Sequence, residues 1–225
     1  MTATESTGAT GRSLNRPALW TLTFVLAFLG LDAAQVVYRF FLPTDGWSST
    51  FGELDSATYL YVMNLVGLPS GLRPSDVVTG LEGRPLEDYR PGIRPTFWRA
   101  GATVEYVVMR DGAELRLPVP LGRWTLPAVL RGLFDFIPEI VTSLGTLLVL
   151  GVAFLAFVRR PEEPPARALL VFAAALSAPT ISGLLPVDFS VNFDRFAYAV
   201  TNFYTYMAYG ILIAPALLSF TFVFP

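Results

Sequence analysis

Residues 137–158 read IPEIVTSLGTLLVLGVAFLAFV, and Glu139 is the single charged residue in this stretch. A helix of this length would rise about 33 Å, which is enough to cross about 30 Å of bilayer hydrocarbon. The overall composition agrees, because 53% of the residues are hydrophobic and 15% are charged, whereas soluble domains carry about 25% charged residues. Together with a mean hydropathy of +0.51, these features predict an integral membrane protein.

Three other apolar runs are long enough to cross a bilayer. We therefore predict four transmembrane helices, at 17–42, 137–158, 166–185 and 196–225. A cleaved signal peptide is the alternative for the first of them, because Leu31–Gln35 is weakly similar to a cleavage site. A retained anchor is favoured, since the apolar run Leu19–Val37 continues past that point.

The distribution of arginines predicts how these helices are oriented. The polar tail 1–16, which we expect to be disordered, contains Arg12 and Arg16. The loop 159–165 begins with Arg159 and Arg160 and is followed by Arg167. The loop 186–195 instead carries two aspartates and one arginine. Short loops rich in arginine stay in the cytoplasm. We therefore expect a multi-pass protein of the cell membrane, with both ends of the chain cytoplasmic and residues 43–122 outside.

The residue types that are missing exclude several kinds of chemistry. All sixteen cationic residues are arginine, and the chain has neither histidine nor cysteine. Thiolate metal sites, histidine-dependent triads and lysine bases are therefore excluded within this chain, and we expect no metal, no cofactor and no enzymatic activity, including protease activity. The net charge of −2 gives no indication of nucleic-acid binding.

Residues 43–122 differ from the apolar runs, because charged residues, glycines and prolines are frequent there. Alternating, β-branched and aromatic residues predict strands at 59–66, 77–81, 103–109 and 115–121. Asp111-Gly112 lies between the last two strands and is a strong hairpin signal. We expect a folded β-rich domain here, followed by an interfacial segment at 123–136, where apolar residues alternate with charged ones.

Several pieces of this domain resemble, in order, parts of a PDZ domain. Residues 71–78, GLRPSDVV, are similar to the PDZ turn that leads through Gly-Leu-x-x-Gly-Asp into a strand, with Ser75 in place of the glycine. Residues 81–86, LEGRPL, resemble the next turn, and residues 101–121 resemble the closing hairpin. The expected fold class is a multi-pass α-helical membrane protein with an inserted β-rich (α+β) PDZ-like extracytoplasmic domain.

Two local expectations accompany this resemblance. We expect Gly83 to lie at a turn that needs a positive φ, and Asp76 to accept hydrogen bonds from nearby backbone amides. The segment that matches the groove helix, 86–99, contains Pro91-Gly92 and Pro95. Because these residues break helices, we expect the groove helix to be damaged.

The resemblance also implies that a peptide binds by adding a strand to an edge of the sheet. The candidate residues of that edge strand are Tyr59, Leu60, Tyr61 and Val62. Thr44–Trp47 stands where a carboxylate-binding loop would lie upstream. A purely structural or protein-docking domain is the alternative interpretation.

Polar residues inside the predicted spans are candidates for a functional or structural contact. Asp32 and Gln35 lie in the first span, and an intramembrane carboxylate needs a partner. Polar residues recur at helical spacing in the fourth span, at Asn202, Thr205, Tyr206 and Tyr209. Asp32 faces this stripe in one hypothesis, and in the other it lies near a helix end in a wet interface.

The order of the segments leads to two expectations about function. This order, in which an outer PDZ-like domain lies between one span and a further group of spans, resembles the input region of bacterial membrane signalling proteins of the histidine kinase type. This resemblance implies a sensor that binds a peptide or protein outside, commonly as a homodimer. The alternative is a scaffold or accessory subunit of a membrane complex. No basic residue follows the last span, so we expect a fragment whose output lies beyond residue 225.

Overall fold

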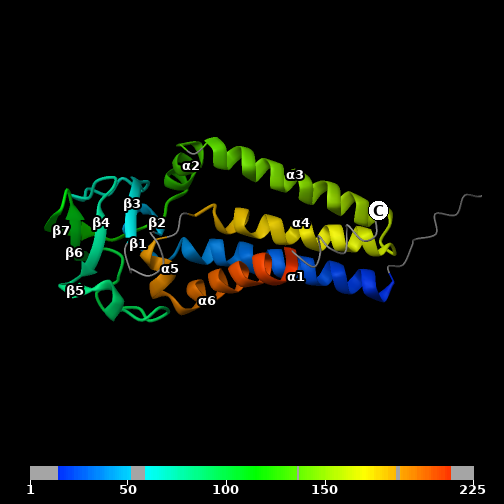
Figure 1. Ribbon diagram of the computed structural model, residues 1–225, viewed down its shortest axis with the longest axis horizontal. Helices are drawn as coiled ribbons and strands as arrows, with labels where there is room; N and C mark the ends of the chain where they lie inside the picture. The colour runs from blue at the N-terminus through cyan, green and yellow to red at the C-terminus, as the bar shows by residue number, and fades with distance from the viewer. Residues whose placement is uncertain (1–14, 52–58, 136, 186–187, 214–225) are drawn as a thin grey trace, which may run out of the picture.

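The computed structural model describes residues 15–51, 59–135, 137–185 and 188–213. In Figure 1 the strands gather at one end of the molecule, and α1, α3, α4 and α6 extend side by side from them. Three helices in the described part of the chain are long and apolar enough to cross a membrane. They are α1 (Arg16–Arg39), α3 (Ile137–Arg159) and α4 (Pro164–Ser182).

Local chemistry explains where these long helices begin. Asn15 caps α1 by accepting a 2.9 Å hydrogen bond from the backbone amide of Ala18, which satisfies one of the free donors at a helix start. Prolines occupy the first turns of α1 and α4, where a missing amide hydrogen costs nothing. The observed helices agree with the predicted spans 17–42, 137–158 and 166–185 to within a few residues.

Small side chains let α4 occupy the middle of the helix group. Ala173, Ala174 and Ala178 are buried against α1 and α3 in one apolar cluster that also contains Phe28 and Phe157. Small residues allow helix backbones to approach closely, which is the usual way that membrane helices pack. Most other apolar side chains of α3 are exposed, and this helix is long and apolar enough to cross a membrane.

The fourth predicted span, 196–225, is described only in part. An α-helix, α6 (Arg195–Tyr204), continues directly into a π-helical segment, η2 (Thr205–Leu212). Asp194 caps α6 by accepting hydrogen bonds from the backbone amides of Phe196 and Ala197. The remainder of this predicted span lies outside the described residues.

The β-rich domain between α1 and α3 contains two antiparallel sheets. The larger has the strand order β2-β3-β4-β6-β7, and β5 pairs with the far part of β4. The strands are β2 (Trp47–Phe51), β3 (Tyr59–Asn64), β4 (Val77–Leu81), β5 (Arg84–Pro85), β6 (Thr103–Arg110) and β7 (Ala113–Pro120). The smaller sheet pairs β1 (Pro43–Thr44) with β8 (Gly122–Arg123), where the chain leaves and re-enters the helical part.

Two turns confirm the local expectations. Asp111 and Gly112 adopt positive φ angles of 52° and 80° and close the β6–β7 hairpin. Gly83 has a φ of 71°, as predicted. Ser75 also has a positive φ, of 75°, a conformation that favours glycine.

Asp76 confirms the prediction that it binds nearby backbone. Its Oδ2 accepts a 2.7 Å hydrogen bond from the amide of Arg73. The guanidinium of Arg110 holds both carboxylate oxygens, at 2.7 and 2.6 Å, and also donates to the carbonyl of Gly71. Asp76 therefore fixes the turn that enters β4 to the strand opposite it.

The structure corrects the expectation that residues 59–62 form an edge strand. β3 lies inside the sheet, because Tyr59 and Leu60 pair with β2 on one side and with β4 on the other. The edges of the larger sheet are β2 and β7. Peptide binding by Tyr59, Leu60, Tyr61 and Val62 stays a prediction.

The segment between β5 and β6 agrees with the prediction made from its prolines. A single short 3-10 helix, η1 (Leu86–Asp88), begins the segment 86–99, and the rest is irregular, as the prolines predicted. Residues 123–136, which were predicted to be interfacial, contain a helix, α2 (Leu126–Asp135). Leu126, Leu130 and Arg131 are exposed on it, whereas Ala128 is buried.

Candidate functional site

A short helix in the loop between α4 and α6 inserts into the core of the β-rich domain. This helix, α5 (Phe189–Phe193), begins at Asp188, whose side chain accepts a hydrogen bond from the amide of Ser190. Phe189 and Phe193 lie one helical turn apart, so their rings stack with centroids 5.7 Å apart. Both are buried among the apolar residues of the sheet.

Rings of the domain surround these two phenylalanines. The ring of Phe193 lies 5.0 Å from that of Trp98 and 5.7 Å from that of Tyr89. The ring of Phe189 lies 6.0 Å from that of Tyr106. We call these five residues the aromatic contact. Because α5 joins α4 to α6, the aromatic contact links the domain core directly to two helices.

Hydrogen bonds and an ion pair reinforce the same connection. The amide of Gly92 donates a 2.6 Å hydrogen bond to the carbonyl of Asn192 in α5. Arg94 forms a 2.6 Å ion pair with Asp194, the cap of α6, and the hydroxyl of Tyr38 in α1 donates to the same carboxylate at 3.0 Å. The irregular segment after η1 is thus tied to α1, α5 and α6.

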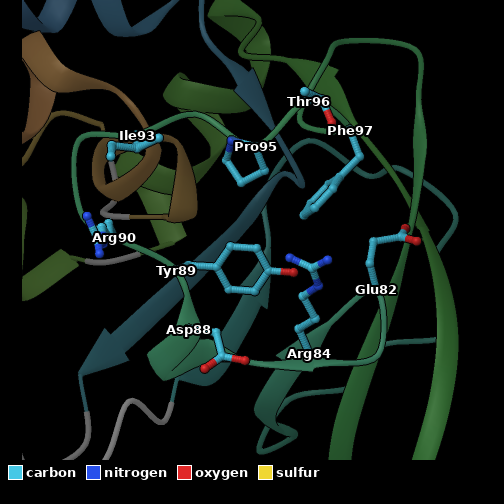
Figure 2. Close-up of a pocket in the computed structure, with 9 residues that line it drawn as sticks. All are labelled: Glu82, Arg84, Asp88, Tyr89, Arg90, Ile93, Pro95, Thr96 and Phe97. Carbon is cyan, nitrogen blue, oxygen red and sulfur yellow. The ribbon is translucent and has the colours of Figure 1, made fainter.

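This irregular segment forms one wall of an open pocket of about 490 Å³. The pocket is shown in Figure 2 and is lined by Glu82, Arg84, Asp88, Tyr89, Arg90, Ile93, Pro95, Thr96 and Phe97. Its volume lies within the range of small-ligand sites. Two arginines, two carboxylates and two aromatic rings therefore surround one hollow on the domain surface.

Tyr89 connects this pocket to the aromatic contact. Its hydroxyl donates a 2.7 Å hydrogen bond to the carbonyl of Leu81, and its ring meets Phe97 edge to face at 5.9 Å. Burial raises the pKa of Tyr89, the charge of Arg84 lowers it, and nearby carboxylates raise it further. The phenol therefore stays protonated and keeps donating to Leu81 at neutral pH.

A second connection between the domain and the helices is polar. It contains Asp32, Gln35, Arg39, Thr44, Ser182, Asp188 and Thr201, which we call the polar seam. Arg39 is its centre, because its guanidinium is buried, interacts electrostatically with Asp32 and Asp188, and donates to the carbonyls of Ser182 and Leu185 at 3.2 and 3.1 Å. Buried charges of this kind require partners.

Asp188 lies at the end of the polar seam nearest the β-rich domain and joins the seam to that domain. The hydroxyls of Thr44 in β1 and of Ser190 in α5 donate to its carboxylate. Burial raises the pKa of Asp188 above its usual range, whereas the charge of Arg39 and these hydrogen bonds act to lower it. One carboxylate thereby holds the ends of α1, β1 and α5 together.

The structure places Thr44–Trp47 in this junction rather than in a carboxylate-binding loop. Thr44, Asp45 and Trp47 are all buried. Asp45 accepts hydrogen bonds from the amide of Trp47 and from the hydroxyl of Tyr106. With its polar groups bound inside the protein, this loop cannot bind a ligand carboxylate in the observed conformation.

The predicted contact between Asp32 and the stripe in the fourth span is also corrected. Asp32 is fully buried, which excludes the wet-interface alternative, and its partner is the hydroxyl of Ser182 in α4. Gln35 does reach α6, where its Nε2 donates to Thr201 at 2.6 Å. Asn202 instead donates to the carbonyl of Tyr198 in its own helix.

Thr205 and Tyr206 are not brought to Asp32 either. Thr205 donates to the carbonyl of Thr201 in the preceding turn, and Tyr206 is 70% exposed. The side chain of Tyr209 lies outside the described residues. Sequence reasoning missed Arg39 and α5, although an arginine at the end of a span and an Asp-capped pair of phenylalanines four residues apart were visible signals.

Comparison with known proteins finds no protein family, no curated protein and no solved structure that matches this chain.

Proposed function

We propose that this chain is the extracytoplasmic and membrane input region of a receptor. In this proposal it crosses the cell membrane four times, with its N-terminus in the cytoplasm and a PDZ-like domain outside that binds a peptide or protein. The proposal rests on the position of α5: this segment joins α4 to α6, and its phenylalanines complete the core of the outer domain.

A ligand in the pocket would act on the helices through a short series of contacts. Tyr89 lines the pocket and packs against Phe193, and Gly92 and Arg94 hold the same wall to Asn192 and Asp194. Movement of this wall would displace α5 and therefore the outer ends of α4 and α6. A ligand shifts such an equilibrium when it binds one arrangement more tightly than the other.

The polar seam supports this proposal because it offers discrete partners for two arrangements of the helices. Arg39, Gln35 and Ser182 come from α1 and α4 and meet Asp188 and Thr201 from the following segments. A shift of α5 would change which carbonyl or carboxylate Arg39 contacts. A scaffold would instead hold its partner without moving the helices, so movement separates the two functions.

The test measures that movement in the full chain embedded in lipid nanodiscs. The chain has no native cysteine, so Leu148→Cys in α3 and Ile211→Cys in η2, both exposed positions, provide unique spin-label sites. A mixture of random hexapeptides with free carboxyl termini is the probe. We expect it to shift the distance between the labels by about 1–2 Å, the usual size of helix movements in switching.

Two variants make this result interpretable. Tyr89→Ala removes the link between pocket and α5 and is expected to abolish the shift, whereas Arg116→Gln on the exposed face of β7 is expected to leave it unchanged. Peptides that bind without any change of distance in the unmodified chain would contradict the receptor proposal and favour the scaffold.

A further inference from the structure

A second hollow lies where α1 meets the β-rich domain. Its volume is about 520 Å³, and its lining includes Phe41, Arg94, Thr96, Trp98, Arg99 and Arg123. We call it the outer groove. The lining holds three arginines and no carboxylate, unlike the pocket of Figure 2, in which two arginines are balanced by two carboxylates.

Two of these arginines have no ion-pair partner among the described residues. Arg94 is paired with Asp194, but neither Arg99 nor Arg123 forms an ion pair or a side-chain hydrogen bond with any residue that the structure describes. Both are exposed. Two guanidinium groups that line one hollow without counter-charges favour an anionic ligand, and guanidinium binds phosphate through paired hydrogen bonds.

The chain path holds the outer groove at the end of α1. Phe41 follows the last residue of that helix by two positions and is 66% exposed. Pro43 in β1 pairs with Arg123 in β8, and the indole of Trp98 donates a 3.1 Å hydrogen bond to the carbonyl of Pro43. The arginines are therefore fixed beside the point where an apolar helix of 24 residues ends.

This position selects the kind of anion. A helix of that length rises about 36 Å, so its ends reach the headgroup region of a bilayer whose hydrocarbon is about 30 Å thick. The exposed apolar ring of Phe41 at that level can insert at the boundary between headgroups and acyl chains. A phosphate in the groove and an acyl chain beside Phe41 would then belong to one molecule.

We propose that the outer groove binds the phosphate of an anionic phospholipid in the outer leaflet, with Arg99 and Arg123 as its ligands. A zwitterionic lipid is a poorer ligand because its own cation balances the phosphate. The proposal depends on the domain lying outside the membrane beside α1, and it does not depend on receptor activity, peptide binding or movement of α5.

The experiment uses the full chain in nanodiscs that contain equal amounts of phosphatidylglycerol and phosphatidylcholine. After extraction into mild detergent, native mass spectrometry counts each lipid that stays bound. The test variant is Arg99→Gln with Arg123→Gln, and the matched control is Arg73→Gln with Arg116→Gln, two exposed arginines of the same domain outside both the groove and the pocket of Figure 2. Circular dichroism and elution volume verify that both variants fold.

We expect the unmodified chain and the control to retain phosphatidylglycerol in preference to phosphatidylcholine. In the test variant, the ratio of retained phosphatidylglycerol to phosphatidylcholine should fall about tenfold, because charge-assisted contacts to phosphate are removed. Equal retention of both lipids by the unmodified chain would overturn the proposal without any variant being needed. An unchanged preference in the test variant, or an equal loss in the control, would also overturn it.

A second arm distinguishes a lipid headgroup from a soluble phosphate. Inorganic phosphate is titrated into lipid-free protein in detergent, and the melting temperature is followed. Stabilisation by inorganic phosphate that depends on Arg99 and Arg123, combined with equal retention of the two lipids, would overturn the lipid assignment in favour of a free anion. Loss of helix movement in the spin-label experiment would leave the lipid proposal unaffected.

Discussion

The aromatic contact and the polar seam join the same two parts of the molecule by opposite physical means. In the first, Phe189 and Phe193 fill the domain core with rings that need no particular partner atom. In the second, Arg39 and Asp188 are buried charges that attract each other and depend on specific carbonyl oxygens and hydroxyl groups. The first connection tolerates small changes, and the second accepts few arrangements.

The difference teaches what each connection contributes. Burial of rings is non-directional and stabilises the joined state in proportion to the apolar area removed from water. A buried ion pair adds little net stability but is costly to break, because the remaining charge stays buried without a partner. We infer that the aromatic contact holds the domain to the helices and that the polar seam determines how they align.

The largest expected effect comes from removing the charge at the centre of the polar seam. Arg39→Leu leaves Asp32 and Asp188 buried with no cation beside them, and we expect a loss of about 3–5 kcal/mol in unfolding free energy. Thermal unfolding in detergent, followed by circular dichroism, measures it. Adding Asp188→Asn to Arg39→Leu should restore part of the loss. If Arg39→Leu alone melts at the same temperature as the unmodified protein, the charge of Arg39 is not energetically coupled to the other residues of the seam.

The next largest effect tests the aromatic contact. Phe193→Ala removes a buried ring from the domain core, and we expect it to cost about 3 kcal/mol, as large-to-small changes in cores do. Phe41→Ala is the matched control, because that ring is 66% exposed. Limited proteolysis of the β-rich domain measures the loss of protection, and equal protection of both variants would contradict the role assigned to α5.

Local turns of the β-rich domain were predictable from the sequence, whereas the long-range contacts of the polar seam and of the sheet were not. The Asp111-Gly112 hairpin and the positive φ of Gly83 follow from residues that are neighbours in the chain. One of the two hypotheses placed Asp32 against a partner in the fourth span, but its partner is Ser182, 150 positions away in the sequence, and nothing in either segment specifies that pairing. The interior position of β3 likewise depends on β2 and β4 together.

The same reasoning explains why α5 was missed as a core element. The loop 186–195 is only ten residues long and contains two aspartates. These features predict a short connection between two spans on the outer side of the membrane. Its phenylalanines become core residues only because Trp98 and Tyr106 present a surface for them. The fold of a loop is determined here by the domain it packs against, which periodicity within the loop does not reveal.

A smaller effect is expected within the β-rich domain, where a buried charge keeps its partner. Asp76 is nearly fully buried, and burial alone would raise its pKa, but the hydrogen bonds and charges of Arg110 and Arg73 lower it below its usual value. The ionised form therefore stabilises the fold at neutral pH. That contribution is present above the pKa of the unfolded chain and is lost as pH falls through the lower, folded pKa.

Replacing this carboxylate tests that sign. Asp76→Asn removes the charge but keeps the side-chain shape, and we expect it to lower the unfolding free energy by about 2 kcal/mol at pH 7, as for hydrogen bonds to charged groups. The difference between the two proteins should shrink as the pH falls below about 4. A difference that grows on acidification would show that the carboxylate is not stabilised as an anion.

The smallest effect is expected for an ion pair that water surrounds, and it provides the reference for all the others. Arg116 lies 3.3 Å from Glu105, but their side chains are 61% and 45% exposed. Solvent screens such a pair and ordering two long side chains opposes it, so Arg116→Gln should change the unfolding free energy by about 0.5 kcal/mol or less. When Arg116→Gln is measured beside Asp76→Asn in the same urea titration, the comparison shows how much burial adds to the contribution of an ion pair to the unfolding free energy. If both changes cost the same, burial does not set the strength of ion pairs in this protein, and the large effect expected at Arg39 loses its physical basis.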